Sequence, residues 1–180
     1  ADAPANLTGK IYLVTGTSSE IGTVIAHELA RRGAKVVAGN RNTRKAEQAM
    51  AAVQSQSDDL SGLFIEELDV SSLASVRAFA TQVQADPKIS HIDALILNAG
   101  IMALPERNLS VDGFEMQMAT NVLGHHLLTS LLLSKLIAAP SAVVVSTSSS
   151  ASSSVNRRAI WDDINAEEKY AAWEVYGLSK

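Results

Sequence analysis

The 180-residue chain is long enough for one domain with a sizeable buried core, since 47% of its residues are hydrophobic, but too short for two comfortable domains. Its 15 Lys and Arg against 19 Asp and Glu give a net charge of −4 without a long basic run, which argues against a nucleic-acid partner. The absence of cysteine excludes disulfides and thiolate metal sites, and the lack of a long apolar run or a signal-peptide pattern predicts a cytoplasmic protein without a membrane span.

Short apolar runs alternate with longer helical patterns along the chain. The runs that we expect to form buried strands are 10–16, 34–40, 62–70, 92–100 and 142–148. Between them, 20–33, 71–86 and 112–137 carry apolar residues at helical spacing, and the last of these helices is predicted to open near Asp112. Strands that are apolar on both faces and separated by helices predict a doubly wound α/β fold, a parallel sheet with helices on both faces.

The stretch TGTSSEIG at 15–22 directly follows the first predicted strand and opens a helix. This context turns a weak glycine pattern into a candidate pyrophosphate site at a helix N-terminus, with an ordinary strand-to-helix turn as the alternative. The residues that we expect to contribute are Gly16, Ser18, Ser19, Ile21 and Gly22.

The second predicted strand ends in GNRN, where an NAD-binding chain has an acidic residue for the ribose hydroxyls. Arg41 stands there instead, and a guanidinium suits the 2′-phosphate of NADP, with Arg44 or Lys45 as helpers. The alternative is that these basic residues lie at the solvent-exposed start of a helix and bind no phosphate.

The stretch YGLSK at 176–180 places Tyr176 and Lys180 four residues apart, on one face of a helix. The ammonium can then favour the ionised phenol, which makes Tyr176 a candidate general acid and base. Alone, this spacing is a weak signal. We expect no metal site, because the adjacent His125 and His126 diverge on a helix.

The order of these motifs resembles that of the short-chain dehydrogenase/reductase family, over nearly the whole chain. A glycine-rich turn follows strand one, NAG at 98–100 follows strand four, NVLGHH at 121–126 lies in the next helix, and serines after strand five precede the Tyr-Lys pair. The stretches TNVLGHHLLTSLLL and WDDINAEEKYAAWEVYGLSK look most like retinol-dehydrogenase-like and fungal reductase members.

The resemblance implies roles for several residues in a single Rossmann-type NAD(P)-binding domain. Tyr176 would be the catalytic acid/base, Lys180 its partner that also holds the nicotinamide ribose, and Asn121 would position the water of a proton relay. The catalytic serine would be Ser148, although Ser146, Thr147 and Ser149 are close enough to dispute it. The residues implied to line the rest of the cofactor cleft are Asp69 and Val70, beside the adenine, and Asn98, Ala99 and Gly100.

The chain departs from the family pattern in two places. Glu20 replaces the middle glycine of TGxxxGxG. Its carboxylate either points to solvent from the first helical turn, where an acid suits the helix dipole, or weakens cofactor binding by repulsion. The sequence also stops at Lys180, before the last strands of the family, so we expect an incomplete chain whose fifth strand is an unprotected edge.

These observations predict an NADP-dependent oxidoreductase that moves a hydride between nicotinamide and a carbonyl or alcohol substrate, with NADPH as the reduced cofactor. Two alternatives stay open on the same fold: a nucleotide-binding or sensor protein without turnover, and a lyase or epimerase. The long apolar helix at 112–137 is compatible with a homodimer.

Overall fold

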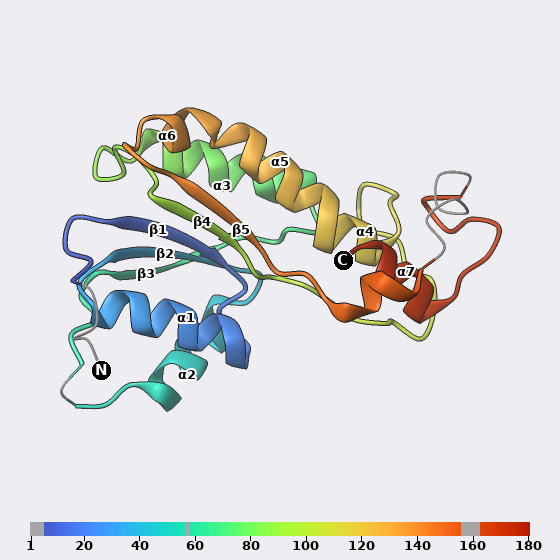
Figure 1. The fold of residues 1–180 in the computed structure, drawn as a ribbon, viewed down its shortest axis with the longest axis horizontal. Helices are drawn as coiled ribbons and strands as arrows, with labels where there is room; N and C mark the ends of the chain where they lie inside the picture. Colours follow the sequence, from blue (N-terminus) through green and yellow to red (C-terminus); the bar gives the residue numbers. More distant parts are fainter. Residues whose placement is uncertain (1–5, 57, 156–162) are drawn as a thin grey trace.

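The computed structural model describes residues 6–56, 58–155 and 163–180, apart from the side chains of Glu20 and Ser154. Its centre is a parallel sheet in the order β3-β2-β1-β4-β5 (Figure 1). The strands are β1 (Ile11–Thr15), β2 (Lys35–Asn40), β3 (Leu63–Glu67), β4 (Ala94–Leu97) and β5 (Val143–Ser146). The doubly wound α/β fold predicted from the sequence is therefore confirmed.

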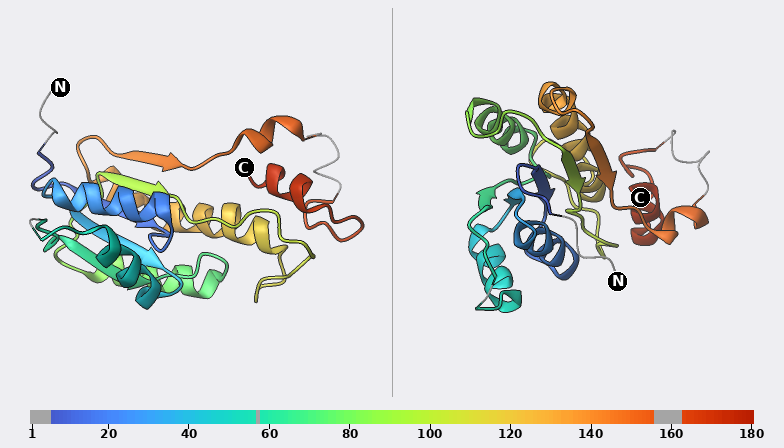
Figure 2. Two further views of the ribbon diagram at one scale, coloured as in Figure 1. Left: turned by 90° about the horizontal axis from the view of Figure 1, so that it is seen from below. Right: turned by 60° about the vertical axis from the view of Figure 1, so that its left-hand side comes forward.

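Helices cover both faces of this sheet (Figures 1 and 2). The helices α1 (Glu20–Arg31) and α2 (Thr43–Val53) lie on one face, and α3 (Leu73–Ala85), α5 (Gly124–Leu131) and α6 (Leu133–Ile137) lie on the other. In the ranges that the structure describes, no helix is both long and apolar enough to cross a lipid bilayer.

The core forms two apolar clusters, one on each face, because successive strand residues point to opposite sides. Leu13 of β1 joins Phe79 of α3 and Leu128 of α5 in one cluster, whereas the next residue, Val14, joins Ala26 of α1 in the other. Phe79 is only 2% exposed. Burial of a side chain of this kind stabilises the fold by about 1.5–3 kcal/mol.

The segment expected to be one helix over 112–137 is broken into shorter pieces. Gly113 has a left-handed φ of 82°, and helix α4 (Met116–Met118) starts only at Met116, because the Glu115 carboxylate caps it by accepting the backbone N–H of Met118 at 2.8 Å. A π-helical turn, η1 (Ala119–Leu123), follows before α5 begins. Gly124, the first residue of α5, packs against Val70, which lies three residues after β3. A Cβ at Gly124 would collide with the carbonyl oxygen of Val70.

Strand β5 lies at the edge of the sheet, as expected, and pairs with β4. Val143, Val144 and Val145 are each about half exposed, at 52%, 48% and 48%. The 3₁₀ helix η2 (Ser150–Ser154) follows β5, and α7 (Ala172–Leu178) packs against it beyond the carboxyl ends of the strands (Figure 2). Trp161 and Asp162, the first two residues of the stretch WDDINAEEKYAAWEVYGLSK, lie outside the described ranges.

Candidate active site

The predicted residues gather around two adjoining clefts at the carboxyl ends of the strands, where α/β sheets bind ligands. The larger, of about 520 Å³, is here called the tyrosine cleft, and the smaller, of about 220 Å³, the arginine cleft. The predicted residues in the tyrosine cleft are Ser18, Ser19, Ile21, Asn98, Gly100, Tyr176 and Lys180. Those in the arginine cleft are Gly16, Ser18, Ser19, Arg41, Asp69, Val70, Ala99 and Gly100. Because Ser18, Ser19 and Gly100 line both, the two clefts form one continuous site.

The glycine turn after β1 leaves no room for side chains. Gly16 has a left-handed φ of 72°, and a Cβ on it would lie 2.7 Å from the Cα of Ala99. A Cβ on Gly22 would collide with the carbonyl oxygen of Gly16 and lie 2.6 Å from Nδ2 of Asn98. The Asn98 amide in turn donates to the carbonyl of Gly16 at 2.8 Å. Gly22 and Asn98 therefore fasten the turn to the segment that follows β4.

Helix α1 starts at Glu20, with Ser19 as its N-cap. The Ser19 side chain makes no capping hydrogen bond, which leaves the first N–H groups of α1 without a side-chain cap. Such a helix end suits a phosphate. The Glu20 side chain lies outside the described part of the structure, so both interpretations of its carboxylate stay predictions.

Tyr176 lies on α7 and lines the tyrosine cleft, with 8% of its surface exposed. Trp173 packs on it edge to face, with ring centroids 5.9 Å apart. Lys180 follows the helix rather than lying on it, since α7 ends at Leu178. Its Nζ donates to the carbonyl of Thr147 at 2.8 Å, and burial lowers the pKa of this lysine. The phenol and the ammonium thus share one cleft.

Asn121 lies in the π-helical turn η1, behind the cleft wall. Its side chain accepts the backbone N–H of Ile101 at 3.0 Å and donates to the carbonyl of Ile101 at 3.0 Å and to the Ser179 hydroxyl at 2.8 Å. A Cβ on Gly100 would lie 3.2 Å from Oδ1 of Asn121 and 3.3 Å from Nζ of Lys180. The glycine therefore lets Asn121 and Lys180 approach the same point of the chain.

Ser148 does not line either cleft. Its hydroxyl donates to the backbone carbonyl of Lys180 at 2.8 Å, and Thr147 lines the tyrosine cleft beside Tyr176. The Ser149 hydroxyl caps the 3₁₀ helix η2 by accepting the backbone N–H of Ala151. The catalytic role of Ser148 stays a prediction.

Arg41 is exposed at the rim of the arginine cleft, directly after β2. Lys45 lines both clefts, whereas Arg44 lines neither. The sequence interpretation missed Asn40, which is 1% exposed and whose Oδ1 accepts the backbone N–H of Thr17 at 2.7 Å. Asn40 thus holds the glycine turn from the end of β2, one residue before Arg41.

A hydrogen-bonded clamp connects the chain before α7 to the segment before α4. Gln117 is fully buried, and its amide donates to the Tyr170 hydroxyl at 3.1 Å and to the carbonyl of Ala172 at 3.2 Å. The amide oxygen accepts the backbone N–H of Ala103, whose φ of 47° is left-handed. Gln117 therefore sets the start of the helix that carries Tyr176, and neither its type nor its spacing signalled this in the sequence.

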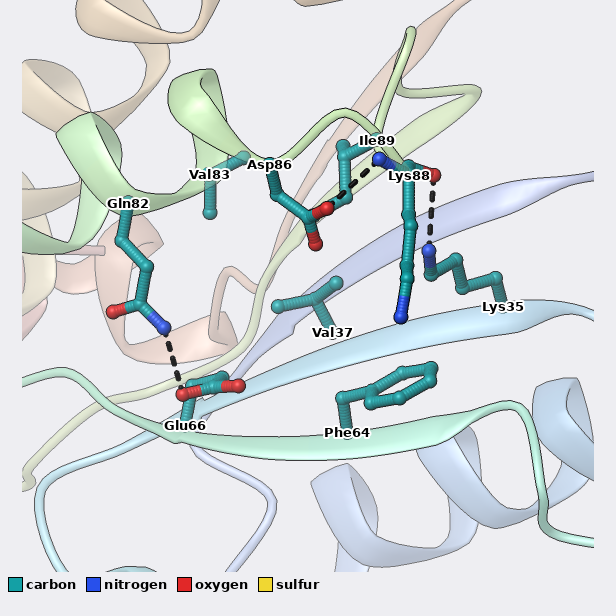
Figure 3. Close-up of a pocket in the computed structure, with 9 residues that line it drawn as sticks. All are labelled: Lys35, Val37, Phe64, Glu66, Gln82, Val83, Asp86, Lys88 and Ile89. Carbon is teal, nitrogen blue, oxygen red and sulfur yellow. Dashed lines mark hydrogen bonds between the residues drawn. The ribbon is translucent and has the colours of Figure 1, made fainter.

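A separate hollow of about 160 Å³ lies between β2, β3 and α3, and contains none of the predicted residues (Figure 3). Its polar side chains already bind groups within it. Gln82 donates to Glu66 at 2.9 Å, Lys35 donates to the carbonyl of Lys88 at 2.9 Å, and Asp86 accepts the Lys88 N–H at 2.8 Å. We assign no chemistry to this hollow.

The sequence and the fold match known proteins. The family model described as short chain dehydrogenase matches residues 10–160. The chain is 40% identical to human retinol dehydrogenase 14, over 98% of this chain and 55% of that protein. It is 37% identical to the short-chain dehydrogenase/reductase prx1 of Penicillium roqueforti, over 97% of this chain and 50% of that protein. The chain thus spans about half the length of these two relatives.

Among solved structures, an uncharacterized protein from Mycobacterium paratuberculosis superposes with a TM-score of 0.78 at 39% identity, covering 96% of this chain and 58% of that one. A metagenomic short-chain oxidoreductase in complex with NADP superposes with a TM-score of 0.72 at 25% identity, covering 98% of this chain and 72% of that one. Sequence, fold and motif order agree, and the chain belongs to the short-chain dehydrogenase/reductase family.

Proposed function

We propose that the chain is the NADP-binding and catalytic part of a carbonyl reductase or alcohol dehydrogenase in which Tyr176 moves the proton. The observation that carries this proposal is the shared cleft: Tyr176 and Lys180 line the same cavity as Ser18 and Ser19 of the glycine turn. A proton donor and a phosphate-binding turn in one cavity suit hydride transfer to a carbonyl.

The residues present fit a dinucleotide. The Gly16–Gly22 turn has room for no Cβ at either glycine, and the first turn of α1 has no side-chain cap, so a pyrophosphate could approach the backbone closely. When bound, the cofactor supplies or accepts the hydride. Ser18, Ser19 and Gly100, which line both clefts, would contact its middle portion.

Side chains of the protein would transfer the proton and stabilise the group that loses it. In reduction, the Tyr176 hydroxyl would donate its proton to the carbonyl oxygen as the hydride arrives at the carbonyl carbon. Lys180, held by Thr147, would stabilise the phenolate that remains and hold the nicotinamide ribose. Asn121 would connect the far side of Lys180 to a water relay. Ser148 would orient the substrate only if its hydroxyl leaves the Lys180 carbonyl.

NADP is the cofactor that the charges at the arginine cleft favour. The rim offers Arg41 directly after β2, where an acid would repel a 2′-phosphate, and Lys45 lies on the wall shared with the tyrosine cleft. The relative solved with NADP lends support from the same family. A cytoplasmic location and a homodimer remain predictions from the sequence.

A titration followed by a turnover assay tests the proposal. NADPH fluorescence should change on mixing with the protein, and NADPH should then be consumed with at least one member of a panel of aldehydes and ketones. Binding without consumption would favour the nucleotide-binding alternative. Conversion of a substrate without net change in NADPH would favour the lyase or epimerase. No binding of either NADPH or NADH would refute the proposal.

A further inference from the structure

A buried hydroxyl at the end of β1 joins three segments of the candidate active site. Thr15 is fully buried, and its Oγ1 lies 3.0 Å from the backbone nitrogen of Asn98, 3.0 Å from that of Ala99 and 2.9 Å from Nε2 of His125. His125 is 4% exposed and lies on α5, and its other ring nitrogen, Nδ1, lies 3.3 Å from the carbonyl oxygen of Asn121. The threonine and the histidine therefore connect the segment after β4 to the π-helical turn.

Counting protons fixes the direction of every bond in this network. A backbone N–H can only donate, so Asn98 and Ala99 both donate to Oγ1 of Thr15, and the hydroxyl has its single hydrogen left for a third partner. That hydrogen must point to Nε2 of His125, which must then be bare. The ring hydrogen consequently sits on Nδ1 and is donated to the Asn121 carbonyl.

The surroundings support a neutral ring. Burial lowers the pKa of His125 to about 4, because its effect exceeds that of the Asn121 carbonyl, which raises the pKa; the positive charge of Lys180 lowers the pKa further. A protonated ring would also present an N–H to the Thr15 hydroxyl, which would lose its acceptor.

We propose that His125 is a positioning residue that, as the neutral Nδ1–H tautomer, holds the Asn98–Ala99 segment and the Asn121 turn in their catalytic arrangement. The role rests on the function proposed above. Asn98 lines the tyrosine cleft and Ala99 lines the arginine cleft. The side chains of Asn121 and Lys180 both approach Gly100. Loss of the acceptor at Nε2 leaves the hydrogen of the buried Thr15 hydroxyl without a partner and removes the link between the two segments, which loosens both together.

The tautomer can be measured without any variant. Long-range proton–nitrogen NMR correlations of the histidines at neutral pH should show His125 with a protonated Nδ1 and a bare Nε2. A ring protonated on Nε2, or on both nitrogens, would overturn the proposal.

Two substitutions at His125 then test the positioning role, with a matched control at its exposed neighbour. His125→Leu removes the acceptor, whereas in His125→Gln the amide oxygen replaces Nε2. We expect His125→Leu to lower kcat about tenfold or more, while His125→Gln and His126→Leu stay within about threefold of the starting protein. Equal activities of the Leu and Gln variants at position 125 would overturn the proposal.

Hydrogen exchange at the Asn98 and Ala99 amides, which donate to Thr15, separates this idea from the proposed function. Exchange should speed up about tenfold in His125→Leu and remain unchanged in His125→Gln. If the starting protein reduces no carbonyl, the proposed function fails, and only the hydrogen exchange still tests the role of His125. Equal exchange rates of the Asn98 and Ala99 amides in His125→Leu and His125→Gln would refute that role.

Discussion

Lowering the pH from about 7 to about 4.5 should destabilise the native state by about 2–3 kcal/mol through His125 alone. Folding lowers the pKa of this histidine from 6.5 to about 4, chiefly because burial disfavours the imidazolium. Above pH 6.5 the ring is neutral whether the chain is folded or unfolded, so it has no effect. Between 6.5 and about 4 only the unfolded chain takes up the proton, and the free energy of unfolding falls with the pH.

The size of the effect follows from that window. At about 1.36 kcal/mol per pH unit, the whole range from 6.5 to about 4 is worth about 3 kcal/mol, most of which is lost by about pH 4.5. This is a large part of the roughly 5–15 kcal/mol that stabilises a typical domain. It should therefore be visible in ordinary denaturant titrations.

The assay is urea unfolding at several pH values, for the starting protein and for His125→Gln, which cannot take up a proton. Carboxylates with a lowered pKa, such as Glu28 at about 2, also lose their stabilising effect in acid, but mainly below about pH 4.5 and equally in both proteins. Over this pH range the starting protein should thus lose about 2–3 kcal/mol more of its free energy of unfolding than His125→Gln does. Parallel pH curves for the two would refute the reasoning that places a neutral, buried ring at this position.

Three further substitutions test the site. Arg41→Asp should lower the affinity for NADPH about 10- to 150-fold and leave the affinity for NADH unchanged. The control Arg44→Asp, outside both clefts, should change neither affinity. Equal losses of NADPH affinity in the two variants would remove Arg41 from the cofactor site. Gly22→Ala should destabilise the fold by about 1–3 kcal/mol or more and weaken both cofactors, because the methyl group meets the Gly16 carbonyl; unchanged denaturation and binding would contradict the packing. Ser148→Ala should lower turnover about 10² to 10³-fold and more than Ser146→Ala does, and a uniform mild effect would mean that no hydroxyl there faces the substrate.

The strands of the sheet were predictable because each follows from the local pattern of apolar residues. Val36, Val37 and Ala38 form a short, β-branched apolar run of the kind typical of a strand buried on both faces, and β2 is found there. The late start of the helix at Met116 rests on Gly113 and the Glu115 cap, whereas its interruption at 119–123 was not predictable because the contacts there are remote: Gly124 packs on Val70, and Asn121 binds Ile101. The spacing of apolar residues in that stretch contains no trace of either contact.

The candidate site likewise contains parts that were predictable from the sequence and parts that were not. The glycine turn and the Tyr176–Lys180 pair depend on residues close in sequence, so the turn's context and the order of the motifs indicated them, although Lys180 lies beyond the end of α7. The contact between Thr15 and His125 joins residues 110 positions apart, and that between Asn40 and Thr17 joins residues 23 apart, so only the folded chain brings them together. The adjacent histidines of α5 were the available signal for the first, and they predicted nothing about the partner of His125.

The central claim is that Tyr176 delivers the proton while a hydride passes from NADPH to a carbonyl. The most direct test follows NADPH deuterated at nicotinamide C4 with a reducible carbonyl, for the starting protein, Tyr176→Phe and the control Tyr12→Phe on β1. We expect deuterium on the product's carbinol carbon for the starting protein and the control, and no product from Tyr176→Phe, which still binds NADPH within a few-fold. Deuterated product from Tyr176→Phe at an unchanged rate would contradict this claim.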